Sequence, residues 1–120
     1  AADRMNPAVK GLYKPHQPAV IRLIDRVISA GHDAGIWVGM CGEAAASPVM
    51  IPLLVAMGLD EFSVSASSVL KTRWMLSQID RGSAEGLLDE VLGLESAEAI
   101  EQHVHVYLKE KGIHGKENHD

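Results

Sequence analysis

The fold of this chain is decided by one stretch, Ile36-Trp37-Val38-Gly39-Met40-Cys41-Gly42-Glu43. Its first half carries Ile, Trp and Val, which is typical of a strand, and Gly42 marks a turn after it. We expect residues 36–41 to form a short strand that is buried on both faces, as in a parallel sheet. The only cysteine, Cys41, then stands at the carboxyl end of a strand, where α/β folds place their chemistry.

On the residues alone, Cys41 has two interpretations. A thiol that points into a packed core is only a small, inert hydrophobe. A thiol at a strand end beside Gly42, which lets a ligand approach the backbone, can be a reactive group. The sequence leaves both open.

Helical patterns flank this strand on both sides. Before it, Pro18 suits a first helical position, and apolar residues recur at helical spacing up to Gly35, a left-handed cap. After it, Ser47 and Pro48 begin an almost wholly apolar helix over 49–57, closed by Gly58. Such a helix needs cover on more than one side.

A second short strand is expected over 61–65, with Phe62 and Val64 on one side. Helices are expected over 68–79, 84–92 and 97–111. Serines are expected to cap them, namely Ser65, Ser67 and Ser68 for the first, Ser83 for the second and Ser96 for the third. Gly112 ends the last helix, and residues 113–120 form a polar tail that we expect to be disordered.

Two strands about 25 residues apart with a helix between them have βαβ spacing and should run parallel. Two strands alone do not make a stable parallel sheet, and a complete (β/α)8 barrel needs roughly 250 residues. We therefore expect an α/β fold that is a piece of such a barrel, over 1–112, followed by the 113–120 tail.

Composition excludes several classes. The net charge is -5 and the basic residues are scattered, which argues against nucleic acid. No apolar run reaches the roughly 20 residues of a membrane helix. The start, Ala1-Ala2-Asp3-Arg4-Met5-Asn6, lacks a basic region followed by an apolar one, so we expect that it is not a signal peptide. One cysteine cannot form an internal disulfide, so a reducing cytoplasm is expected. His103 and His105 are two residues apart and cannot chelate together on a helix, so we expect surface histidines and no metal site.

Three segments carry a family resemblance: Ala1-Ala2-Asp3-Arg4, Gly39-Met40-Cys41-Gly42-Glu43, and Met57-Gly58-Leu59-Asp60-Glu61-Phe62-Ser63 followed by Ser65-Ala66. Over residues 1 to about 80 the chain resembles the carboxyl-terminal part of phosphoenolpyruvate–protein phosphotransferases, the enzyme I family of bacterial sugar uptake. The later helices match loosely. Pyruvate phosphate dikinase shares the barrel but fits the second strand less well.

The resemblance implies a phosphoenolpyruvate-binding barrel that forms a homodimer. The phosphoryl group would pass to a histidine of a separate amino-terminal domain and then to a histidine-containing phosphocarrier protein. Cys41 matches the cysteine that protonates enolpyruvate to pyruvate, and Arg4 matches an arginine that grips the phosphate. The Mg²⁺ ligands, the phosphohistidine and the remaining arginines are expected upstream of Ala1, so this chain alone should be inactive.

The chemistry fits these residue types. A free thiol has a pKa of about 8.5, so it is protonated at neutral pH yet can release a proton. A guanidinium fork matches the oxygens of a phosphoryl group. Glu43 is expected to have a structural role, and the serines over 65–68 to be caps rather than a phosphate site.

The chain departs from the family after Glu43, where Ala45-Ala46-Ser47-Pro48 stands in place of a Gly-Asp pair, and at Ala56, which replaces a glycine. The first change reshapes the loop beside Cys41. Two alternatives stay open: a stand-alone dimerisation or interaction module, and a fragment like pyruvate phosphate dikinase.

Overall fold

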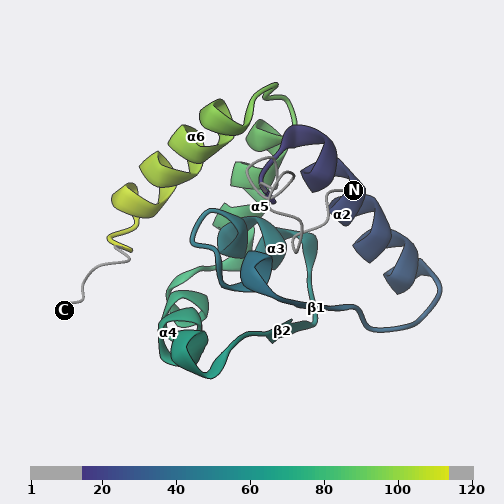
Figure 1. The fold of residues 1–120 in the computed structure, drawn as a ribbon. Helices are drawn as coiled ribbons and strands as arrows, with labels where there is room; N and C mark the ends of the chain where they lie inside the picture. Colours follow the sequence, from purple (N-terminus) through teal and green to yellow (C-terminus); the bar gives the residue numbers. More distant parts are fainter. Residues whose placement is uncertain (1–14, 114–120) are drawn as a thin grey trace, which may run out of the picture.

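A computed structural model describes residues 15–113. Arg4 and residues 114–120 of the expected tail lie outside this part of the chain. The elements, in order, are α2 (Pro18–Asp33), β1 (Gly39–Cys41), the 3-10 helix η1 (Glu43–Ala46), α3 (Met50–Met57), β2 (Glu61–Ser63), the 3-10 helix η2 (Ala66–Ser68), α4 (Val69–Gln78), α5 (Arg81–Val91) and α6 (Ala97–Glu110). Figure 1 shows their arrangement.

The two strands are parallel, as their spacing predicts, and α3 is the crossover between them. In the register, Met40 lies opposite Phe62, and both are half-buried against the core. The pairs Gly39 with Glu61 and Cys41 with Ser63 alternate with them and are exposed. Successive side chains of a strand point to opposite faces of a sheet. Helices cover the face that carries Met40 and Phe62, and within residues 15–113 the other face is bare. In Figure 1, α2 and α3 both lie above the strands.

The expectation that strand 36–41 is buried on both faces is wrong. The strand begins only at Gly39, and the side chains of Ile36 and Trp37 are 61% and 67% exposed. The Ile36 amide donates to the Gly31 carbonyl at 3.0 Å, so it completes the end of α2 instead of joining the ladder. The second strand is likewise shorter than expected, over Glu61–Ser63.

Helix α3 is the centre of the core, since seven of its eight residues are buried: Met50, Ile51, Pro52, Leu53, Leu54, Ala56 and Met57. Pro52 is tolerated because it lies in the first turn, where backbone amides have no intrahelical acceptor. Gly58, at φ 84°, ends the helix in the left-handed conformation that the sequence predicts. Helices α2, α4 and α5 pack around α3.

One carboxylate joins three segments at the amino end of the strands. Asp60 Oδ2 accepts hydrogen bonds from His32 Nε2 and from the Val38 amide, both at 2.7 Å. The Asp60 amide in turn donates to the Val38 carbonyl at 2.9 Å. The Val38 amide, and then His32, hold the pKa of Asp60 below its usual value. This clamp ties the end of α2 to the approach to both strands.

Of the serine caps that the sequence predicts for α5 and α6, only the one of α6 is confirmed. Ser96 Oγ accepts from the Ala99 amide at 3.0 Å, which confirms it as the cap of α6. Helix α5 instead begins at Arg81 and is capped by Asp80, which accepts from the Ser83 amide at 2.8 Å, so the expectation for Ser83 is wrong. The Asp80 carboxylate places a negative charge at the helix start, and the Ser83 hydroxyl donates to it at 2.8 Å instead of capping the helix.

The serines before α4 do not cap it with their side chains. Ser65 Oγ bonds to the hydroxyls of Ser67 and Ser68 at 3.2 and 3.3 Å, and η2 intervenes before the helix. At the other end of the chain, Ile113 is only 2% exposed and its amide donates to the Leu108 carbonyl at 2.8 Å. The packed part therefore extends one residue into the expected tail.

Shortening a buried side chain of α3 should lower the stability of the fold. Leu53 is fully buried, so Leu53→Ala should lower the free energy of unfolding by about 2–5 kcal/mol in urea titrations, through lost contacts and a cavity. Leu70 of α4 is 81% exposed, and Leu70→Ala should stay within about 0.5 kcal/mol of the wild type. Equal losses in the two variants would contradict this core.

The Asp60 clamp should give the fold an acid-sensitive component. Because its folded-state pKa is depressed, the stability that Asp60 contributes is present above the unfolded-state pKa of aspartate and is lost as pH falls through the folded-state value. Asp60→Asn should therefore be less stable than wild type at pH 7, and the difference should shrink toward pH 3 in urea titrations. The exposed Asp89→Asn on α5 is the control and should follow the wild type at every pH.

Candidate functional site

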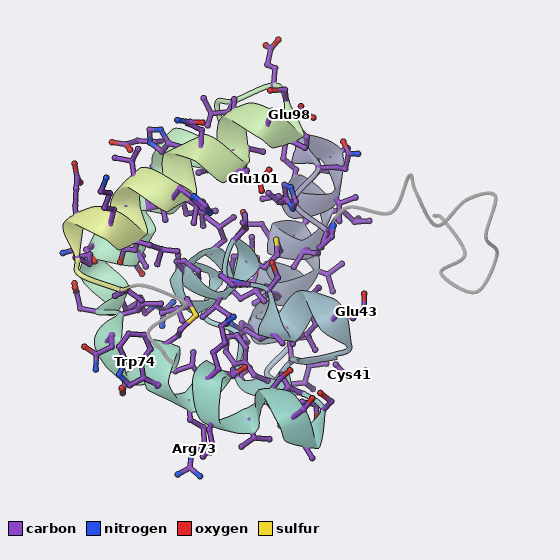
Figure 2. The ribbon with its side chains drawn as sticks, turned by 60° about the vertical axis from the view of Figure 1, so that its left-hand side comes forward. Cys41, Glu43, Arg73, Trp74, Glu98 and Glu101 are labelled. Atoms are coloured by element: carbon purple, nitrogen blue, oxygen red, sulfur yellow. The ribbon has the colours of Figure 1, made fainter. Side chains whose placement is uncertain are left out.

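Cys41 is the last residue of β1 and its side chain is exposed, on the bare face of the sheet. A shallow hollow of about 320 Å³ surrounds it, lined by Trp37, Gly39, Met40, Cys41, Glu61 and Ser63. Figure 2 shows Cys41 at the edge of the molecule. The interpretation of Cys41 as an inert core thiol is therefore wrong.

Two glycines shape the chain around this thiol. Gly42 follows it at φ 97° and ψ -168°, a conformation essentially restricted to glycine, and turns the chain sharply into η1. Within β1, a side chain at Gly39 would stand 3.1 Å from the Trp37 ring and 3.3 Å from Cβ of Glu61. Because Gly39 has no side chain, Trp37 and Glu61 can lie across the strand and line the hollow.

Sequence reasoning missed Glu61 and Ser63 as neighbours of the thiol. Ser63 lies directly opposite Cys41 in the register, and Glu61 is two residues earlier on the same face. The signal was available, because placing Phe62 and Val64 on one side of this strand places Glu61 and Ser63 on the other. The hollow thus combines a thiol that can donate a proton, a hydroxyl that can donate or accept a hydrogen bond, and a carboxylate.

Glu43 begins η1 directly after the Gly42 turn, and Figure 2 shows it at the same corner of the molecule as Cys41. Ala44 and Ala45 of η1 are buried and anchor the turn. Arg4 lies outside the described residues, so the geometry does not place it beside Cys41.

Three histidines, His16, His32 and His103, lie beside carboxylates. His103 Nε2 donates to Glu90 at 2.6 Å, and His16 lies 3.9 Å from Glu101. His32 and His105 are exposed, whereas His16 and His103 are half-buried. Within this part of the chain, no three His, Cys, Asp or Glu side chains gather into a possible metal site.

None of the helices described here combines the length and the apolar character that a membrane crossing requires.

Comparison with known proteins also covers residues 1–14, which precede the described part of the chain. Residues 1–81 match the family of PEP-utilising enzymes, in its PEP-binding domain. A protein named phosphoenolpyruvate-protein phosphotransferase from Priestia megaterium is 49% identical over 100 residues, which cover 83% of this chain and 18% of that protein. Proteins of the same name from Bacillus sp. (strain S) and Listeria monocytogenes are 52% and 46% identical, over 83% and 92% of this chain. The chain spans less than a fifth of the length of these relatives.

The exposure of the thiol can be checked chemically, because Cys41 is the only cysteine. The folded chain should react with one equivalent of a thiol reagent such as Ellman's reagent, at a rate close to that of the urea-unfolded chain. As a matched control, Met40→Cys combined with Cys41→Ser moves the thiol to the half-buried neighbour that faces the core, and should react much more slowly when folded. A wild-type thiol that reacts only after unfolding would contradict the site.

Proposed function

Because the chain belongs to the family of PEP-utilising enzymes, we propose that it is the carboxyl-terminal part of the phosphoenolpyruvate-binding barrel of a phosphoenolpyruvate–protein phosphotransferase. The observation that carries this proposal is the exposed thiol of Cys41 at the carboxyl end of β1. The family model ends at residue 81, but the Listeria monocytogenes relative matches 92% of the chain, so its similarity extends into the later helices.

The barrel assignment is supported by the one-sided cover of the sheet. In a (β/α)8 barrel, helices lie outside the ring of parallel strands, and alternate side chains point to the helices or to the barrel interior. Met40 and Phe62 face the helices here. The bare face with Cys41, Glu61 and Ser63 then becomes the interior, and the thiol stands at the mouth where barrel enzymes carry out their reactions.

In the proposed reaction, Cys41 acts as the general acid. The bond between the phosphoryl group and the enol oxygen of phosphoenolpyruvate breaks, and the phosphoryl group moves to a histidine outside this chain. The electron pair left on the enolate forms a bond from its methylene carbon to the thiol proton, which gives pyruvate and a thiolate. Solvent protons then restore the thiol, and the reverse sequence removes a methyl proton from pyruvate.

The reaction also needs phosphate-binding and metal-binding groups, which we place outside the described residues. Arg4 is proposed to hold the phosphoryl oxygens, because a guanidinium offers a planar pair of donors. Within residues 15–113 no side chains gather into a magnesium site, and the Mg²⁺ ligands are proposed to precede Ala1. We also propose that the whole protein transfers the phosphoryl group to a histidine-containing phosphocarrier protein, forms a homodimer and is cytoplasmic. This chain alone is proposed to be inactive.

The choice of phosphotransferase over a pyruvate phosphate dikinase-like enzyme rests on the relatives. Proteins at about half identity over most of the chain carry the phosphotransferase name. An independent interaction module would not need an exposed thiol, a glycine-only turn and a carboxylate gathered in one hollow.

The test uses a hybrid enzyme, in which this chain replaces the matched region of the Priestia megaterium relative. In the hybrid, Cys41→Ala should lower the rate of pyruvate formation at least about 100-fold, the usual contribution of a positioned acid, while phosphoenolpyruvate still binds. Cys41→Ala removes only the sulfur, so the backbone turn at Gly42 should persist.

The control variant is Ser77→Ala, an exposed residue of α4. It should form pyruvate at the rate of the unmodified hybrid. Full turnover by the Cys41→Ala hybrid would show that the thiol is not the acid.

A further inference from the structure

Helix α2 carries a wide apolar surface, of which only one part is covered within residues 15–113. Ile21 and Ile28 are each 1% exposed and face α3 and the core. Val20, Leu23 and Val27, by contrast, are 37%, 59% and 53% exposed. Together with the exposed Ala30 they recur at steps of three and four residues, which places them along one line of the helix. We call Val20, Leu23, Val27 and Ala30 the outer stripe.

On one side of the helix the half-buried Ile24 joins the outer stripe to the buried face. At 100° per residue, however, the centre of the stripe lies well over 90° around the helix from Ile21 and Ile28, and Arg22 and Arg26 separate the two on the other side. A helix at the surface of a domain normally turns polar residues outward opposite its buried face. Exposed apolar residues on a regular a/d spacing are instead typical of a helix that packs against a second helix.

The topology indicates which segment would cover the outer stripe. Helices α2 and α3 pack side by side on the same side of the sheet (Figure 1). Within residues 15–113, β1 pairs only with β2, so its second edge is unpaired. A strand that precedes α2 would join that edge through a right-handed crossover. The helix before that strand would then lie beyond α2, next to the outer stripe.

The relatives supply the length of chain that such a unit needs, since this chain spans only 18% of the Priestia megaterium protein. We propose that the outer stripe is the docking surface for the helix of the βα unit that precedes this region in longer family members. The inference rests on the barrel of the proposed function but not on its chemistry. The facing helix should carry apolar residues at a/d spacing, and acidic residues where it passes Arg22 and Arg26.

The test compares two exposed valines in two molecular contexts. Val27 of the outer stripe and Val106 of α6 are 53% and 47% exposed, so Val27→Asp and Val106→Asp should both be nearly neutral in the 120-residue chain. In the hybrid enzyme, Val27→Asp should lower the thermal unfolding midpoint at least about 3 °C more than Val106→Asp does, because a charge would be buried between helices.

If Val27→Asp prevents the hybrid from folding, Val27→Thr and Val106→Thr can be compared instead, because threonine introduces a polar group without a charge. Equal effects of the two positions in the hybrid would overturn the proposal. So would a 120-residue chain that sediments as a dimer and is made monomeric by Val27→Asp, since a second copy would then be the occupant. Neither result touches pyruvate formation, so the proposed chemistry is judged separately through Cys41→Ala.

Discussion

Helix α3 constrains the whole domain, because a helix with seven buried residues out of eight can exist only where other elements cover it on nearly every side. Helices α2, α4 and α5 and the 3-10 helix η1 provide that cover. The inner face of the two strands, through Met40 and Phe62, completes it. The helices are therefore gathered on one face of the sheet.

This one-sided arrangement also creates the candidate site. With α3 and its neighbours on one face, the alternate residues of both strands are left on the other, and Cys41, Ser63 and Glu61 become neighbours there. A parallel sheet is stable only when both faces are covered. The bare face is thus both the weakest feature of the domain and the place where a barrel interior would form.

The two ends of the strands have different physical characters. At the amino end, Asp60 receives the His32 side chain and the Val38 amide and fixes how α2 meets the strands. At the carboxyl end, the Gly42 turn leads away from the thiol and leaves a hollow. Barrel enzymes commonly divide stability and catalysis between their two faces in this way. If the domain is part of such a barrel, as we propose, Asp60 stabilises the fold and Cys41 lies at the face that carries the chemistry.

The sequence by itself determined the kind and order of the elements, the parallel pairing, the glycine ends of α2, α3 and α6, and the Ser96 cap. These features depend on backbone preferences and spacing over a few residues. Only the tertiary structure decided that β1 is short and bare on one face, that Asp80 displaces Ser83, and that Glu61 and Ser63 flank the thiol. Burial and cross-strand neighbours depend on residues distant along the chain, and no local pattern records whether a covering element is present.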